Sequence, residues 1–203
     1  MSRAHVRTRY GVKFLQRTHP LVRLLSKEHS LPTMHGTQVW RSSFMLMDYL
    51  AQNPLTAGER VMELGCGWGL LGIYCAKHFP VDVMLVDADP LVFPFVEAHI
   101  RLNAVQVRTH EVTFDRLADQ TLREHDVLLG ADICFWPELA TQLRRLIARA
   151  LSQGVRRILL ADPGRISFLR LAEEFEHRHE GRLISWKAHR KVGTRGYLLV
   201  IDR

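Results

Sequence analysis

Short apolar runs alternate with amphipathic segments along most of the chain from residue 60 onward. Apolar runs of about four to eight residues are typical of buried strands, and apolar residues three and four positions apart are typical of helices. The predicted strands of this region cover residues 60–64, 81–86, 105–110, 126–129 and 157–161. The predicted helices cover residues 20–29, 39–50, 70–78, 91–103, 115–123, 138–151 and 166–177. Strands that alternate with helices predict an α/β fold with a parallel, doubly wound sheet.

Two further strands are predicted towards the C-terminus, over residues 183–188 and 196–201. A short turn around Gly193 and Thr194 joins them. Because a parallel pair needs a crossover of about a dozen residues, these two strands must run antiparallel. The predicted fold is therefore a Rossmann-like doubly wound sheet of seven strands, mostly parallel and ending in an antiparallel hairpin.

Basic residues dominate the N-terminal end of the chain, which has 203 residues and a formal net charge of +7. Residues 1–27 hold five arginines and two lysines, and the first acidic residue is Glu28. Such a segment either contacts an acidic partner or is a solvated, partly disordered tail, and we expect the second. We divide the chain into a basic N-terminal extension, residues 1–35, and one domain, residues 36–203.

The cysteine and histidine patterns argue against a disulfide framework and a metal site. Cys66, Cys75 and Cys134 form no CxxC pair, so we expect reduced thiols. The eleven histidines show no ligand spacing, and we predict no metal. No apolar run reaches the about 18 residues of a membrane span, and no apolar segment near the N-terminus resembles a secretory signal. We expect a cytoplasmic protein without membrane association.

Three glycines at alternate positions, Gly65, Gly67 and Gly69, separate the strand at 60–64 from the following helix. Glycine weakens regular structure, so this density indicates a sharp turn that also lets a ligand approach the backbone closely. The amides at the start of the next helix carry a partial positive charge. The stretch is therefore a candidate nucleotide or nucleoside site.

Two registers of this loop favour two different ligands. Residues 67–72 match GxGxxG, and Asp87 lies 20 residues after Gly67, which is the spacing of a dinucleotide site. Read from Glu63, the pattern Glu-x-Gly-x-Gly-x-Gly resembles the first motif of class I S-adenosylmethionine-dependent methyltransferases, whose seven-stranded sheet ends in an antiparallel hairpin. This resemblance implies S-adenosylmethionine as the cofactor. Glu63 and the three glycines would bind it, and the Asp87 carboxylate would accept from both ribose hydroxyls.

Three further segments resemble one branch of that superfamily, the protein-lysine methyltransferases of methyltransferase family 16. They are Gly36-Thr-Gln-Val-Trp40, Gly130-Ala-Asp-Ile-Cys-Phe135 and Ala161-Asp-Pro-Gly-Arg165. The resemblance covers roughly residues 36–165 together with the hairpin, and it implies methyl transfer to a protein lysine. The family carries Asp-x-x-Tyr in the second segment, so the sequence departs from the family at Phe135.

The acceptor side is assigned to Asp132 and Phe135. Asp132 ends a strand on the ligand-binding edge of the sheet, where its carboxylate would orient an amine or else cap the helix starting near Pro137. Phe135 would supply an aromatic wall without the family hydroxyl. Arg165 is either a loop cation tied to Asp162 or a substrate contact, and we favour the first.

Four residues complete the predicted cofactor site. Trp40 either packs over the cofactor or lies in the core of its helix. Phe114 and Asp115 follow the third strand, where such folds hold the adenine, although Asp115 is an equally good helix cap. Gly130 lies at the end of the fourth strand.

Two other functions stay open. The basic charge favours a methyltransferase acting on RNA, or on a small molecule, although the chain lacks the Asn/Asp-Pro-Pro-Tyr tetrapeptide of many enzymes that methylate nucleic-acid amino groups. A non-catalytic module that only binds S-adenosylmethionine is the third hypothesis. We expect a protein substrate, and the sequence does not predict an oligomeric state.

Overall fold

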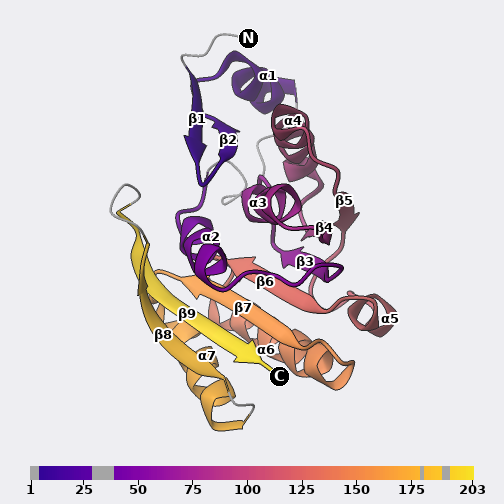
Figure 1. The fold of residues 1–203 in the computed structure, drawn as a ribbon, viewed down its shortest axis with the longest axis vertical. Coiled ribbons are helices and arrows are strands. Elements are labelled where there is room, and N and C mark those ends of the chain that lie inside the picture. The colour runs from indigo at the N-terminus through magenta and orange to yellow at the C-terminus, as the bar shows by residue number, and fades with distance from the viewer. Residues whose placement is uncertain (1–4, 29–38, 179–180, 189–192) are drawn as a thin grey trace.

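A seven-stranded sheet forms the centre of the computed structural model, which describes residues 5–28, 39–178, 181–188 and 193–203 (Figure 1). Its strands are β3 (Arg60–Leu64), β4 (Asp82–Asp87), β5 (Arg108–Glu111), β6 (Val127–Ala131), β7 (Arg157–Asp162), β8 (Arg182–Lys187) and β9 (Arg195–Asp202). Their order across the sheet is β5-β4-β3-β6-β7-β9-β8. The first five run parallel, and β9 pairs antiparallel with both β7 and β8. The predicted fold class is confirmed.

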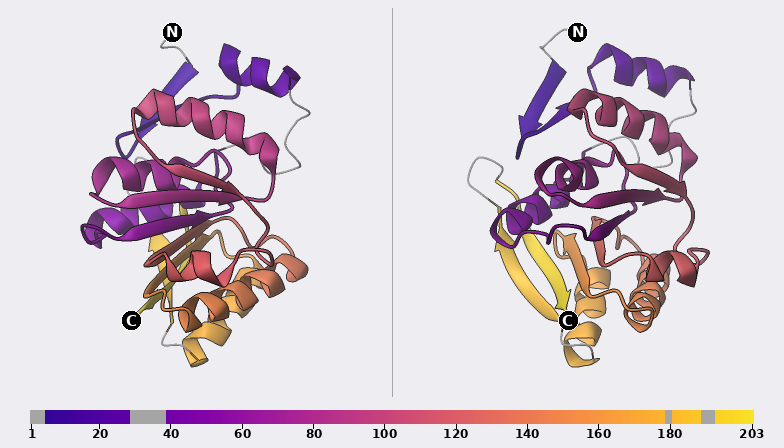
Figure 2. Two further views of the ribbon diagram at one scale, coloured as in Figure 1. Left: turned by 90° about the vertical axis from the view of Figure 1, so that its right-hand side faces the viewer. Right: turned by 45° about the vertical axis from the view of Figure 1, so that its right-hand side comes forward.

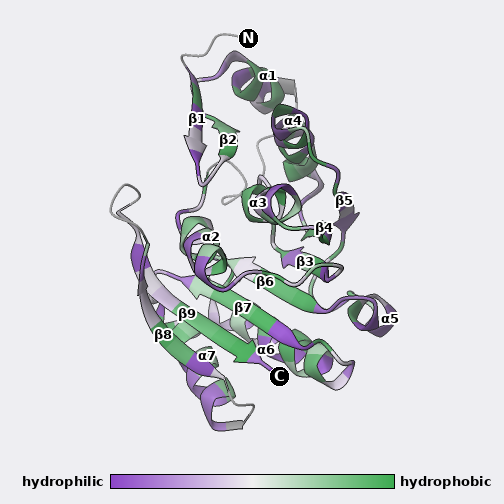
Figure 3. Ribbon diagram, in the orientation of Figure 1, coloured by the Kyte–Doolittle hydropathy of each residue, from purple (hydrophilic) through white to green (hydrophobic). Residues whose placement is uncertain are grey.

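Helices cover both faces of the sheet (Figure 2). They are α2 (Ser42–Gln52), α3 (Leu70–His78), α4 (Phe93–Asn103), α5 (Asp119–Arg123), α6 (Pro137–Ser152) and α7 (Ile166–Arg178), and a short 3-10 turn, η2 (Pro90–Val92), precedes α4. Neighbouring strand residues face opposite layers: Val61 packs with α2 and α3, and Met62 packs with α6 and α7. Both are fully buried, and burial on two faces explains why most positions of the central strands are apolar (Figure 3).

The N-terminal stretch is folded over its described residues, and the expectation of a solvated tail is wrong there. Strands β1 (Val6–Arg9) and β2 (Val12–Leu15) form a hairpin, and helix α1 (Pro20–Glu28) follows. Tyr10 and Gly11 form its turn with φ of 47° and 75°, as a two-residue hairpin requires. The side chains of Val12, Phe14 and Leu15 are buried in the main core, so their burial offsets the cost of ordering this basic segment.

Side chains of α4 hold this hairpin through its backbone. The amide of Asn103 accepts from the N–H of Lys13 at 2.8 Å and donates to its carbonyl at 2.8 Å, as a neighbouring strand would. The buried ring of His99 accepts from the N–H of Leu15 at 3.1 Å through Nε2, while Nδ1 donates to Phe95. Burial lowers the pKa of His99 to about 4 and keeps the ring neutral. The predicted boundary at residue 35 lies outside the described residues and stays a prediction.

Two further sequence expectations need correction. The strand predicted over 105–110 begins later, at Arg108, because its pairing with β4 sets Arg108 opposite Met84. The helix predicted over 115–123 is shorter, because residues 114–116 form a turn before α5 begins at Asp119. Among the described helices, none combines the length and apolar character that crossing a bilayer requires.

Candidate functional site

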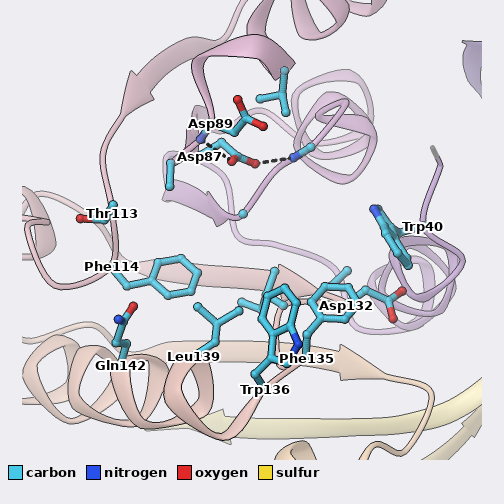
Figure 4. Close-up of a pocket in the computed structure, with 16 residues that line it drawn as sticks. Trp40, Asp87, Asp89, Thr113, Phe114, Asp132, Phe135, Trp136, Leu139 and Gln142 are labelled. Carbon is cyan, nitrogen blue, oxygen red and sulfur yellow. Dashed lines mark hydrogen bonds between the residues drawn. The ribbon is translucent and has the colours of Figure 1, made fainter. Parts of the chain in front are cut away.

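A cavity of about 210 Å³ opens at the carboxyl ends of β3, β4 and β6 (Figure 4). Ligands of doubly wound sheets bind at this edge, in the crevice beyond the strand ends. The cavity is lined by Trp40, Gly65, Gly67, Asp87, Ala88, Asp89, Val92, Thr113, Phe114, Ala131, Asp132, Ile133, Phe135, Trp136, Leu139 and Gln142. Apart from Trp40, these residues come from the ends of β4 and β6, from the β3–α3, β4–η2, β5–α5 and β6–α6 connections, from η2 and from the first turns of α6.

The three glycines of the β3–α3 loop have different roles. All three have left-handed backbones, with φ of 58° at Gly65, 53° at Gly67 and 70° at Gly69. A Cβ at Gly65 would lie 2.6 Å from Ile133 Cγ2, and a Cβ at Gly69 would lie 2.7 Å from Leu85 Cδ1. At Gly67 no atom lies within 4 Å of that position. Gly65 and Gly69 therefore serve close packing, and Gly67 leaves open space for a ligand beside the backbone.

Asp87 holds the loop in place from the end of β4. Its Oδ2 accepts from the N–H of Gly67 at 2.9 Å, and its Oδ1 accepts from the N–H of Asp89 at 3.0 Å. Burial raises the pKa of the Asp87 carboxyl, while these two backbone hydrogen bonds lower it. Within the described residues Asp87 forms no ion pair. An ionised carboxylate has about four acceptor positions, so positions remain for two ligand hydroxyls.

Glu63 lies beneath the loop and does not line the cavity. Its side chain is buried in β3, and Oε2 accepts from the N–H of Gly72 in α3 at 2.7 Å. Burial raises the pKa of Glu63 to about 8, and the Gly72 hydrogen bond lowers it. The structure thus gives Glu63 the task of joining β3 to α3, while its predicted contact with the cofactor stays a prediction.

Asp132, at the end of β6, has a strained backbone, and each of its two carboxylate oxygens accepts one hydrogen bond. Its φ of 57° is left-handed, which Asp tolerates better than most residues. Oδ1 accepts from Arg165 Nη1 at 2.8 Å, and Oδ2 accepts from the N–H of Ser42 at 3.1 Å. The alternative that Asp132 caps α6 is wrong, because no side chain caps that helix at Trp136. Asp132 instead caps the first turn of α2.

Aromatic side chains close one end of the cavity. The ring of Phe135 lies 5.2 Å from that of Trp40, edge to face, and 5.6 Å from that of Trp136. Figure 4 shows Trp40 across the cavity from Asp87, beside Phe135. Trp40 precedes α2 and is half-buried, so it does not lie in the core of that helix. Residues 36–38 of its motif lie outside the described residues.

The remaining predicted residues divide between the cavity and its surroundings. Phe114 lines the cavity near Gly65. Asp115 is exposed outside the cavity lining, and it does not cap α5, whose N-cap is Ala118. Gly130 is buried in β6 behind the wall, where a Cβ would lie 2.4 Å from Ile133 Cδ1. Their predicted contacts with the cofactor stay predictions.

Several lining residues were not predicted from the sequence. Trp136, Leu139 and Gln142 enter the cavity from the start of α6, three positions apart on one face of the helix. That spacing is the only sequence signal that could have found them, and it equally fits a helix facing the core. Thr113, Ile133 and Val92 carry no such signal.

The residues of the cavity fit S-adenosylmethionine. The ribose of this nucleoside needs a carboxylate at the end of the second strand of the parallel series, which Asp87 supplies without an ion pair among the described residues. Its approach to the backbone needs the open side of Gly67. Phe114, Ile133 and Val92 supply apolar surface for a base.

Solved structures that share this architecture include methyltransferases. The chain aligns with the METTL16 MTase domain (crystal form 2) over 98% of its own length and 86% of that chain, with a TM-score of 0.59 at 15% identity. It aligns with the human methyltransferase 10 domain containing protein over 79% of its length and 82% of that chain, with a TM-score of 0.60 at 13% identity. At this identity the likeness shows the fold alone.

The chain belongs to the lysine methyltransferase family, whose model matches residues 23–170. The histidine protein methyltransferase 1 homolog of Dictyostelium discoideum is 25% identical over 65% of this chain and 45% of that protein. The electron transfer flavoprotein beta subunit lysine methyltransferase of Danio rerio is 26% identical over 68% of this chain and 53% of that protein. The protein N-lysine methyltransferase METTL21A of Danio rerio is 31% identical over 61% of this chain and 58% of that protein. The chain thus spans about half the length of the curated relatives it matches.

Proposed function

We propose that the chain transfers a methyl group from S-adenosylmethionine to a protein side-chain nitrogen, with lysine as the expected acceptor. The observation that carries the proposal is the cavity itself, in which Asp87 and the open side of Gly67 meet at the carboxyl edge of the sheet. Membership of the lysine methyltransferase family supports the same conclusion. When bound, S-adenosylmethionine supplies a sulfonium methyl group for in-line displacement by a neutral nitrogen.

In this proposal Asp87 binds the ribose hydroxyls and Gly67 lets the ligand approach the loop. Glu63, Gly65 and Gly69 keep the β3–α3 loop in its conformation through their hydrogen bond and close packing. Phe114 contributes to the wall around the base. Asp115 and Gly130 stay predicted cofactor contacts, and a structure with bound S-adenosylmethionine would test both.

On the acceptor side, Trp40 and Phe135 exclude water and bound the space available to the incoming nitrogen. Asp132 orients the nitrogen. Both of its oxygens already accept one hydrogen bond each, but a carboxylate has about four acceptor positions, so two are left. Phe135 has no hydroxyl, so in this proposal the Asp132 carboxylate accepts the hydrogen bond from the acceptor nitrogen.

The test is incubation of the protein with cofactor carrying a labelled methyl group and a cell lysate, followed by fractionation and hydrolysis of the labelled material. We expect the label in protein, as methylated lysine. Label in RNA or in a small molecule, with none in protein, would support the second function instead. A protein that binds the cofactor and labels no fraction would be a non-catalytic binding module.

We also propose a cytoplasmic location. The three cysteines, Cys66, Cys75 and Cys134, are free and buried, as the reduced thiols of a cytoplasmic protein are. Fractionation of cells that express the protein at its natural level tests this location.

A further inference from the structure

Arg165 joins two buried carboxylates that come from neighbouring strand ends. Its Nη1 lies 2.8 Å from Asp132 Oδ1 at the end of β6 and 2.6 Å from Asp162 Oδ2 at the end of β7. The two carboxylate side chains are 4% and 1% exposed. Two buried like charges repel each other and lose their hydration, so a shared cation is what keeps both in place.

The backbone after β7 is shaped to hold this arginine. The N–H groups of Gly164 and Arg165 donate to Asp162 Oδ1 at 2.8 Å and 2.7 Å. Burial raises the pKa of the Asp162 carboxyl, and these N–H groups together with the guanidinium lower it. Asp162 does not line the cavity, so its task is to fix the position of Arg165.

The same guanidinium also packs on the aromatic wall. Its Cζ lies 4.2 Å from the centre of the Phe135 ring, and that ring in turn contacts Trp40. A planar cation over an aromatic face is attracted by the negative face of the ring, more strongly when both groups are desolvated. One side chain therefore touches both groups that we assign to the acceptor side, and Arg165 itself is absent from the cavity lining.

Asp132 needs this support because its backbone conformation is unfavourable. Its left-handed φ is maintained by three contacts: its N–H donates to the carbonyl of Ala161 at 2.9 Å, and its carboxylate accepts from Ser42 and Arg165. Strained residues persist at sites where the surroundings determine them several times over. Of the three contacts, the one to Arg165 also reaches Phe135.

We propose that Arg165 is a positioning residue for methyl transfer, which holds the Asp132 carboxylate and the Phe135 ring in the geometry that receives the acceptor nitrogen. This inference rests on the proposed function. It predicts that loss of Arg165 impairs the transfer step and spares cofactor binding, because the Gly67–Asp87 half of the cavity does not contact the arginine.

The test compares Arg165→Gln, which removes the cation, with Arg165→Lys, which keeps the cation and loses the planar stack on Phe135. Arg170→Gln is the matched control, since Arg170 is an exposed arginine of α7 outside the cavity lining. Cofactor affinity is measured by calorimetry without acceptor, and transfer is measured with labelled cofactor and the acceptor fraction of the lysate. A ¹³C-phenylalanine NMR spectrum of the cofactor-free protein, with Phe135→Leu for assignment, reports the ring directly.

We expect Arg165→Gln to lower turnover about tenfold to hundredfold, as small displacements of reacting groups do. Its cofactor affinity should match that of the wild type, and its Phe135 resonance should shift. Arg165→Lys should recover part of the turnover, and Arg170→Gln should behave as the wild type throughout. Full turnover in Arg165→Gln would overturn the inference. So would a loss of cofactor affinity as large as the loss of turnover. A wild-type protein that labels no fraction would count against the proposed function. An unshifted Phe135 resonance in Arg165→Gln would count against the positioning role of Arg165, whether or not the wild type is active.

Discussion

Asp87 and Asp132 end the two strands on either side of β3, and both residues line the same cavity. Asp87 accepts only backbone N–H groups, from Gly67 and Asp89, in the contacts of the described residues. Asp132 is tied to the cation of Arg165 and to the first turn of α2. The first arrangement leaves an anionic acceptor free for a ligand. The second is part of a network that shapes a wall. Two aspartates at equivalent strand ends therefore contribute to the site in different ways.

Asp132→Asn should give the largest effect of the variants, a loss of turnover without a loss of cofactor affinity. The amide keeps the size and the tolerance for a positive φ, but it loses the charge that faces the acceptor and Arg165. We expect turnover to fall about a hundredfold, as loss of a group that handles the reacting nitrogen does, with cofactor affinity unchanged. Single-turnover transfer at saturating cofactor measures the first, and calorimetry measures the second. Asp126→Asn, at the other end of the β6 segment, is the control, and a fully active Asp132→Asn would show that the acceptor assignment is wrong.

Asp87→Ala should act on cofactor affinity, which Asp132→Asn leaves unchanged. Removal of the carboxylate takes two charged hydrogen bonds from the ligand, so cofactor binding should weaken by about 1–3 kcal/mol. Titration calorimetry measures this change. Asp82→Ala, at the exposed start of β4, controls for general effects on the strand and should bind like the wild type. Equal cofactor affinity of the Asp87 variant and the wild type would show that Asp87 does not bind the cofactor.

Gly67→Ala sharpens the distinction between packing and ligand access. A Cβ there meets no atom, so the cost to stability should be only the backbone strain of a left-handed alanine, about 1–2 kcal/mol. A similar strain applies to Gly193→Ala, where φ is 63° and the space is also open. Urea unfolding should give similar losses for both variants. Only Gly67→Ala should weaken cofactor binding, and equal binding by the two variants would place the ligand elsewhere.

Glu63 offers a pH test of the cofactor half. The folded protein holds the Glu63 proton up to about pH 8, whereas the unfolded chain releases it near its ordinary pKa of 4.5. Between these values the folded state binds more protons, so the free energy of unfolding should fall as pH rises, by at most about 1.4 kcal/mol per unit. Glu63→Gln still accepts from Gly72 and should lack this slope. Unfolding curves between about pH 5 and pH 8 measure it, and parallel slopes in the two proteins would contradict the assignment.

The cofactor half of the site could be predicted from the sequence because its parts are close in the chain. Glu63, the three glycines and Asp87 span 25 residues, and strand–helix alternation fixes which edge they share. The antiparallel end of the sheet followed from the length of one turn. In these segments the spacing of residues in the sequence is sufficient to predict which of them lie together in the fold.

The acceptor half and the N-terminal hairpin depend on contacts that spacing does not report. Asp132 meets Ser42 across 90 residues and Arg165 across 33. The sequence alone therefore suggested a local cap on α6 that the left-handed backbone of Asp132 does not make. In the hairpin, the alternation of buried and exposed positions covers only Val12, Lys13 and Phe14, and the burial of Val12 and Phe14 depends on α3 and α4. The edge strand β5 is exposed at every position, so only its pairing with β4 fixes where it begins.

The most direct test of the account is a calorimetric titration of the wild-type protein with S-adenosylmethionine and with its demethylated product, with a reduced nicotinamide dinucleotide as the competing ligand. The Gly67–Asp87 half of the cavity predicts saturable binding of both sulfur-containing nucleosides at one site and no binding of the dinucleotide. Absence of binding heat with either nucleoside, or binding of the dinucleotide in their place, would contradict it.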